Sequence, residues 1–248
     1  MIRTRLPRIF ELIDLIDDRR DPNAYFREFE SRLPQSKNLE RAWTARESEF
    51  AALDPEAWGK LKLAARPHLV KKPTDSRSWT QLISTLNEAR GYIYLKEKGC
   101  LAPAFIPKSK RKGIETPDLK GERDGVEPML CEVKTLNISD DEVAARGTIR
   151  ARSTETNLSP QFLKKLQKTI AKAFSQLVNY EPKVKHDRVA LIIPNFDDSL
   201  GEYKCEYYAQ IDEFLESIDT NLCRVAMFNS RTAFDNSVEM RFAEVINE

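Results

Sequence analysis

The sequence predicts a mixed α/β protein with an all-helical segment at its N-terminus, and three observations support this class. Apolar residues recur at helical spacing through about residue 72. From residue 76 onward, a helix, three short extended runs, a second helix and a buried strand follow one another. This order, α-β-β-β-α-β, favours a mixed sheet with helices on both faces. We therefore expect a helical domain over residues 1–75 and an α/β domain over residues 76–248.

In the N-terminal domain, helices are indicated by apolar spacing and by one start signal. Ile9, Leu12, Ile13 and Ile16 recur at helical spacing. Asp21 followed by Pro22 is typical of an N-cap and a first helical position, so a second helix is predicted to begin there. A further charged helix is expected to bury its aromatic side chains, Trp43, Phe50 and Trp58.

The second domain is predicted from helix-end signals and short apolar runs. A helix is expected from about residue 78 to Lys98, because Gly99 is a normal C-terminal stop. Ser159 and Pro160 predict the cap and the first position of a second long helix, which reaches Tyr180. A short helix is expected over residues 212–218, and the polar stretch 137–157 is expected to be a loop. The expected strands are 101–107, 114–120, 129–136, 189–194, 204–210, 223–228 and 238–245.

Composition excludes several classes of protein. The chain has 248 residues, 32% of them charged, and 40 basic side chains nearly balance 39 acidic ones. Its longest strongly apolar run, residues 189–193, is much shorter than the ~20 residues that span a bilayer. Four cysteines without a C-x-x-C pair, and only two histidines, argue against a zinc site, a disulfide framework and a His-activated nucleophile. We expect a cytoplasmic protein without a secretion signal or a membrane partner.

The most informative segments are Thr116-Pro117-Asp118 and Cys131-Glu132-Val133-Lys134. Side chains alternate along a strand, so Glu132 and Lys134 share one face while Cys131 and Val133 share the other. Gly121 and Gly125 lie between the two segments and favour an antiparallel hairpin that brings Asp118 beside Glu132. Two convergent carboxylates suit Mg²⁺ or Mn²⁺, and a neighbouring lysine suits the orientation of an attacking water.

This pattern resembles the PD-(D/E)xK nuclease superfamily, which includes restriction endonucleases, Holliday-junction resolvases and RecB-type exonucleases. The two acids, Asp118 and Glu132, lie 14 positions apart, a separation typical of the family. Glu88 lies in a helix similar to the first helix of such enzymes. Gln176 and Tyr180 are similar to the Q-x-x-x-Y element of the RecB-type branch. The resemblance covers about residues 78–195 and implies a restriction-endonuclease-like αβββαβ core.

The resemblance also implies roles for these side chains. Asp118 and Glu132 would bind the metal, and Glu88 would add a ligand directly or through water. Lys134 would serve the attacking water, while Gln176 and Tyr180 would position the phosphodiester or the lysine. The implied reaction is metal-dependent hydrolysis of a nucleic-acid backbone, with DNA favoured over RNA by analogy with the family.

Basic residues near the motif indicate where nucleic acid would bind. Lys108, Lys110, Arg111 and Lys112 place four positive charges in five residues, just before the Pro-Asp segment. A loop of this charge at the mouth of an acidic site suits contact with a phosphate backbone. Lys172 lies one helical turn before Gln176 and is expected to line the same groove.

Several alternatives stay open on the sequence alone. An E-x-K triplet is common in a chain rich in Glu and Lys, and the competing interpretation is a solvated strand face with a cross-strand acid–lysine pair. The fold also allows a catalytically silent module that binds nucleic acid or a protein partner. An RNA-directed nuclease or the toxic effector of a conflict system is a further alternative. The sequence is compatible with a homodimer and with a protein partner for the N-terminal helices.

Overall fold

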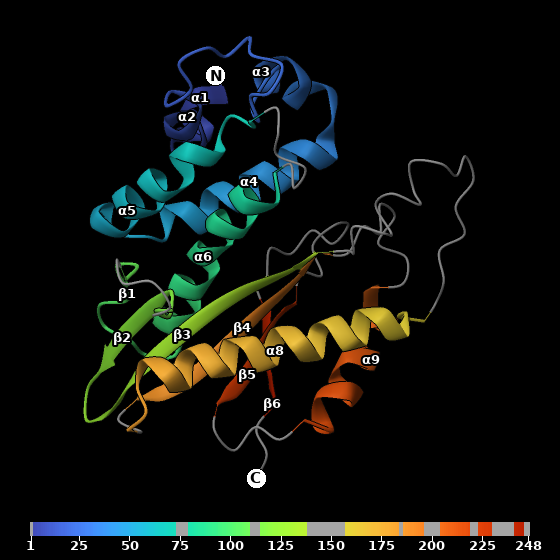
Figure 1. Cartoon of the computed structure of the whole chain (residues 1–248). Coiled ribbons are helices and arrows are strands. Elements are labelled where there is room, and N and C mark those ends of the chain that lie inside the picture. Colours follow the sequence, from blue (N-terminus) through green and yellow to red (C-terminus); the bar gives the residue numbers. More distant parts are fainter. Residues whose placement is uncertain are drawn as a thin grey trace. The chain divides into compact units, whose positions relative to one another are not determined.

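The structure, a computed structural model, describes residues 2–72, 79–109, 115–137, 157–183, 186–195, 204–218, 223–229 and 241–245. The chain forms two compact units, Met1–Tyr94 and Leu95–Glu248. The first carries the N-terminal helices and the second carries a mixed sheet with its own helices (Figure 1). The mixed α/β class predicted from the sequence is therefore confirmed.

In its described residues, the first unit is built of helices and turns. Residues Ile9, Leu12, Ile13 and Ile16 are all buried, so the apolar spacing predicted a genuine core. The helices are α1 (Ile2–Arg5), α2 (Pro7–Ile13), α3 (Phe29–Arg32), α4 (Lys37–Ala51), α5 (Pro55–Ala65) and α6 (Thr80–Glu97), with 3-10 turns at Leu33–Gln35 and Arg66–His68.

The prediction that a helix begins at Asp21 and Pro22 is wrong. Oδ1 of Asp21 accepts a hydrogen bond from the backbone nitrogen of Asn23 at 2.7 Å, which closes a turn instead. Asp side chains compete with helix formation in this way when they bond to a nearby backbone N–H. The next helix begins only at Phe29, whose ring centroid lies 5.4 Å from that of Trp43.

The boundary between the units also differs from the sequence prediction. It falls after Tyr94, inside α6, and not between residues 75 and 76. Polar bonds tie α6 to the earlier helices: Arg46 donates to Asn87 Oδ1 at 2.5 Å, and the Tyr92 hydroxyl donates to Asp54 at 2.7 Å. The sequence analysis placed the boundary where the helical pattern of the N-terminal segment ends. The structure places it later, because these long-range bonds hold most of α6 in the first unit.

The second unit is organised around a mixed sheet in the order β1-β2-β3-β4-β5-β6. Pairing is antiparallel from β1 to β3, parallel from β3 to β5 and antiparallel between β5 and β6. The strands are β1 (Ala104–Phe105), β2 (Leu119–Arg123), β3 (Val126–Asn137), β4 (Asp187–Asn195), β5 (Arg224–Asn229) and β6 (Arg241–Val245), and the helices are α8 (Pro160–Tyr180) and α9 (Lys204–Glu216). The element order α6-β1-β2-β3-α8-β4 matches the order predicted from residue 76 onward.

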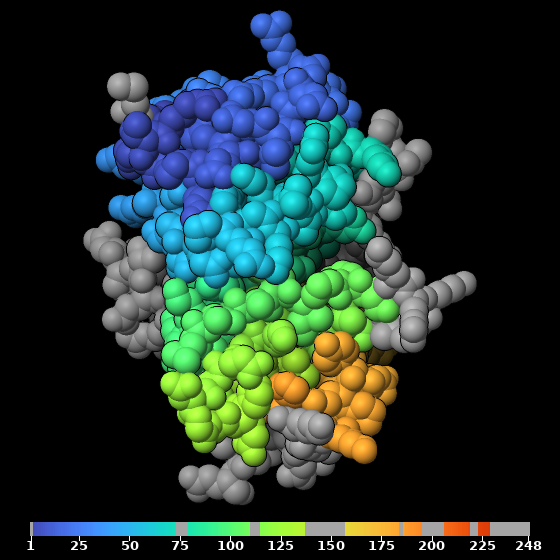
Figure 2. Space-filling view, turned by 90° about the vertical axis from the view of Figure 1, so that its left-hand side faces the viewer, coloured from blue at the N-terminus to red at the C-terminus, as the bar shows by residue number. Residues whose placement is uncertain are grey.

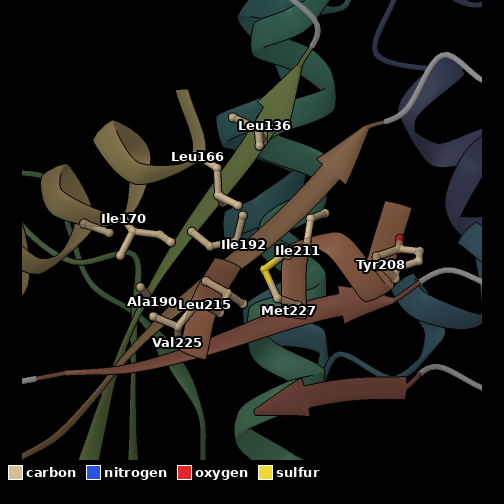
Figure 3. Close-up of a cluster of buried hydrophobic side chains, with 11 residues drawn as sticks. Leu136, Leu166, Ile170, Ala190, Ile192, Tyr208, Ile211, Leu215, Val225 and Met227 are labelled. Atoms are coloured by element: carbon tan, nitrogen blue, oxygen red, sulfur yellow. The ribbon is translucent and has the colours of Figure 1, made fainter. Parts of the chain in front are cut away.

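Helices α8 and α9 pack on one face of this sheet. Figure 3 shows Ile170 of α8 and Ile211 of α9 directed toward Ile192 of β4 and Met227 of β5. All four side chains are buried. Further along α8, Leu177 packs on Leu130 of β3, and Figure 2 shows the orange end of α8 against the yellow-green β2–β3 hairpin. This packing fixes the side of α8 that faces the strands.

The opposite face of the sheet is covered at β2 by the residues that end α6. A Cβ placed on Gly121 would lie only 2.6 Å from Cys100 Sγ and 3.7 Å from Leu95 Cβ. Only glycine lets these two residues approach the strand so closely. The prediction of helical segments on both faces of the sheet is confirmed at this position.

The prediction of a strand over residues 204–210 in the second unit is wrong. Residues 204–210 were expected to be extended, but they form the first half of α9. Tyr208, Ile211 and Leu215 are buried in the core at helical spacing, and this packing outweighs the local strand preference of the two tyrosines. The predicted loop 137–157 lies almost entirely outside the described residues. Among the described helices, none is long and apolar enough to cross a membrane.

Candidate active site

The β2–β3 hairpin places Asp118 opposite Glu132. Leu119 pairs with Cys131 in the antiparallel register, so the residue before β2 falls across from the residue that follows Cys131. Gly125 takes a φ of 65° in the turn, a conformation that glycine adopts at no steric cost. The two carboxylates expected from the sequence are therefore brought to one place by local strand pairing.

Asp118 is buried and held on both sides by backbone groups. Its Oδ2 accepts a hydrogen bond from the backbone nitrogen of Val133 at 2.9 Å. Its carbonyl oxygen accepts from the backbone nitrogen of Ile106 at 2.9 Å. The other carboxylate oxygen, Oδ1, forms an ion pair with Lys108 Nζ. Two of the three partners are main-chain groups, so the position of Asp118 is set by the fold.

Glu132 is the most deeply buried acid of the site, with 1% of its surface exposed. Its Oε2 accepts a hydrogen bond from Gln176 Nε2 at 3.0 Å, and its Oε1 pairs with Lys134 Nζ. Burial first, and the negative charge of Asp118 second, raise the pKa of Glu132 to about 7, against the opposing effect of Lys134. A buried carboxylate with such a pKa is costly to keep charged unless cations accompany it.

Gln176 links the helix α8 to this pair of acids. Its amide nitrogen also donates to the carbonyl oxygen of Thr116 at 2.7 Å, and its amide oxygen accepts from Lys134 Nζ at 3.1 Å. The hydroxyl of Ser159 caps the helix by accepting from the backbone nitrogen of Phe162 at 3.2 Å. Cap and core packing together hold α8 so that Gln176 faces β3.

The donor set suits a hard divalent cation. Asp118 and Glu132 offer carboxylate oxygens, and Mg²⁺ is commonly held by one or two carboxylates that are completed by water and substrate phosphates. Within the part of the chain that the structure describes, no group of three or more His, Cys, Asp or Glu side chains gathers around a common point. Cys131 lies on the other face of β3 by strand alternation, and burial raises the pKa of its thiol well above the usual value. The site therefore offers oxygen ligands and no sulfur.

The other predicted site residues fall in different places. Tyr180 is the last residue of α8 and is 40% exposed, and among the described contacts no hydrogen bond joins it to Glu132 or Lys134. Glu88 lies on α6 in the first unit and is half-buried, and its role as a ligand stays a prediction. Lys172 is exposed on α8, one turn before Gln176. Lys110, Arg111 and Lys112 lie outside the described residues.

The sequence analysis did not predict three contacts of the site. The backbone nitrogen of Val133 and the carbonyl oxygen of Thr116 bind the site through main-chain atoms, which any residue type supplies. Lys108 was expected to contact phosphate, and the structure pairs it with Asp118. Its place in the basic run gave no indication of this partner.

Comparison of the chain with protein-family models, with curated proteins and with solved structures found no match.

Proposed function

We propose that the protein is a metal-dependent nuclease whose centre is Asp118, Glu132 and Lys134. One observation carries the proposal: Gln176, from a helix remote in sequence, donates to Glu132 and accepts from Lys134. A solvated strand face with a simple acid–lysine pair would leave Glu132 in water, yet only 1% of its surface is exposed. Burying two acids beside a half-buried lysine is costly, and such arrangements cluster at functional sites.

The architecture supports the same proposal. The order α6-β1-β2-β3-α8-β4 with a mixed sheet is what a restriction-endonuclease-like core requires. Both halves of the motif lie on the β2–β3 hairpin, and the glutamine of the Q-x-x-x-Y element faces them from α8. Four of the six side chains that the family resemblance selects are thus brought together by separate elements of the fold, namely Asp118, Glu132, Lys134 and Gln176.

The side chains have distinct tasks in the proposed reaction. A divalent cation on Asp118 and Glu132 would supply charge stabilisation and a more acidic water. Lys134 is held between Glu132 and Gln176, where its ammonium group can donate hydrogen bonds to an attacking water or to oxygens that gain negative charge. Gln176 keeps this lysine oriented, and the Val133 backbone nitrogen keeps Asp118 oriented.

The substrate is proposed to be nucleic acid, with DNA preferred to RNA by analogy with the family alone. Lys108, in the segment that follows β1, and Lys172, on α8, are exposed cations. Their contacts would be with phosphates, which position a nucleic acid but do not read its sequence.

The test is cleavage of supercoiled plasmid, linear duplex, single-stranded DNA and RNA in Mg²⁺, Mn²⁺ or EDTA. The decisive variant is Asp118→Asn, because asparagine still offers an acceptor oxygen to the Val133 nitrogen while removing the charge. We expect cleavage to need metal and to fall at least about 100-fold in this variant. Asp124→Asn, in the exposed hairpin turn, is the matched control and should cleave normally.

Each other outcome has a definite meaning. Unchanged cleavage by Asp118→Asn would contradict the proposed site. Binding of nucleic acid without cleavage, in any metal, would favour the catalytically silent module. Cleavage confined to RNA would keep the mechanism and replace the substrate.

A further inference from the structure

The four oxygens of the two acids divide into two kinds. Oδ2 of Asp118 and Oε2 of Glu132 each accept from a neutral donor that is part of the fold, namely the Val133 backbone nitrogen and the Gln176 amide. Oδ1 of Asp118 and Oε1 of Glu132 are each paired with a lysine, Lys108 and Lys134 respectively. The oxygens whose partners can move away to admit a metal are therefore the two that pair with lysines.

The two lysines differ in how firmly they are held. Lys134 extends from the middle of β3, its side chain is 22% exposed, and Gln176 Oε1 lies 3.1 Å from its Nζ. If Lys134 separates from Glu132, its ammonium group still has Gln176 Oε1 as a hydrogen-bond acceptor inside the site. The Lys108 side chain follows β1 at the edge of the sheet and is 64% exposed. This exposure leaves the ammonium group of Lys108 room to turn from Asp118 toward solvent.

Charge balance decides which lysine moves. When both acids are ionised, the two carboxylates and the two ammonium groups sum to zero. A divalent cation bound to Oδ1 of Asp118 would lie within a few Å of the Lys108 ammonium, and like charges at that separation repel strongly in a partly buried site. A phosphate of the nucleic-acid backbone offers the displaced lysine a new anionic partner.

We propose that Lys108 competes with the metal for Asp118 and passes to a substrate phosphate when nucleic acid binds. Nucleic acid then strengthens metal binding by removing the competitor, and metal strengthens nucleic-acid binding by the same factor, as linkage requires. This coupling rests on the proposed function, because it needs a metal at Asp118. In the metal-free protein, Lys108 therefore occupies the Asp118 oxygen until substrate is present.

The experiment measures Mn²⁺ affinity of the full chain by calorimetry, without nucleic acid and at fixed ionic strength. Lys108→Ala should bind Mn²⁺ about threefold to tenfold more tightly than the wild type, the range expected for loss of one partly exposed ion pair. Lys108→Arg restores the charge and should return the affinity toward the wild-type value. Lys120→Ala removes an equal charge two residues from Asp118 on β2 and controls for general electrostatics.

The second readout is the affinity for a short DNA duplex with hydrolysis-resistant phosphorothioate linkages, measured by fluorescence anisotropy in EDTA and in saturating Mn²⁺. Mn²⁺ should tighten duplex binding by about fivefold or more in the wild type. The gain should be smaller in Lys108→Ala, where only direct contact between metal and phosphate remains, and it should be retained in Lys120→Ala.

The outcomes separate this inference from the proposed function. Equal or weaker Mn²⁺ binding by Lys108→Ala, or an equal gain in Lys120→Ala, overturns the competition while leaving a metal site in place. Tighter Mn²⁺ binding that is lost on adding Asp118→Asn, in a protein that cleaves no substrate, upholds the competition and rejects the nuclease. No Mn²⁺ binding by the wild type or by Lys108→Ala rejects both.

Discussion

Gln176 Nε2 lies 3.0 Å from Glu132 Oε2, although 44 residues separate the two side chains in the chain. The same nitrogen lies 2.7 Å from the Thr116 carbonyl oxygen, so one amide joins α8 to the segment before β2 and to β3. Both acceptors would otherwise be buried without a donor from α8. The bond therefore has a structural consequence and a chemical one.

Replacement of this amide should lower both stability and turnover. Gln176→Ala leaves the Glu132 oxygen and the Thr116 carbonyl without their donor, and such buried groups cost about 1–3 kcal/mol. Urea unfolding followed by far-UV circular dichroism measures this loss. Gln167→Ala, at an exposed position of the same helix, is the control and should change stability by less than about 0.5 kcal/mol. Equal unfolding curves for the two variants would show that the bond contributes nothing.

The raised pKa of Glu132 predicts a pH dependence of stability. Burial first, and the charge of Asp118 second, raise this pKa from its ordinary value of 4.5 to about 7. Between these two values the folded protein holds a proton that the unfolded chain has lost. The free energy of unfolding should therefore fall as pH rises from about 4.5 to about 7, by on the order of 1–3 kcal/mol.

Glu132→Gln isolates this contribution, since glutamine does not titrate. The stability of the variant relative to the wild type should increase between pH 5 and pH 8 when both are unfolded in urea. Other groups that titrate over this range cancel in the difference. If the two stability profiles run parallel, the titration of Glu132 is not linked to folding.

A buried ion network in the first unit predicts a separate stability effect. Glu49 pairs with Arg46 at 2.5 Å and with Arg90 at 3.0 Å. Burial opposes ionisation of Glu49, but the two guanidinium groups outweigh burial and hold its pKa below the ordinary value. Its contribution to stability is therefore present above that ordinary value and is lost as pH falls through the depressed pKa.

Glu49→Gln should destabilise the first unit by about 3–5 kcal/mol, because it leaves two half-buried arginines without their anion. All three tryptophans, Trp43, Trp58 and Trp79, lie in this unit, so tryptophan fluorescence follows its unfolding. Glu56→Gln, whose side chain is 80% exposed, is the control and should unfold like the wild type. A loss below about 1 kcal/mol in Glu49→Gln would mean that water enters the network and screens the charges.

The helix α8 illustrates what local signals predict well. Its observed bounds, Pro160–Tyr180, agree with those expected from Ser159, Pro160 and the apolar spacing. Ser159 caps the helix as its position predicts, and Leu166 and Ile170 of the apolar stripe are buried. The β2–β3 hairpin is predicted for similar reasons, since alternation and a glycine turn act within a few residues.

The differences from the sequence predictions have two causes. The turn at Asp21 depends on a competing local bond, whereas the helix over residues 204–210 and the unit boundary inside α6 depend on packing with partners distant in sequence. Tyr208 is placed in a helix because Ile211 and Leu215 must reach the core with it. Local preference alone does not contain that constraint.

The sequence by itself determined the mixed α/β class, the hairpin that carries Asp118 and Glu132, and the cap and length of α8. These follow from periodicity, turn residues and capping, which act over short stretches of chain. Only the tertiary structure decided that Gln176 meets Glu132 and that Lys108 meets Asp118. Such pairings depend on the rotation of α8 about its axis and on the path of the chain after β1, and both are set by packing between elements remote in sequence.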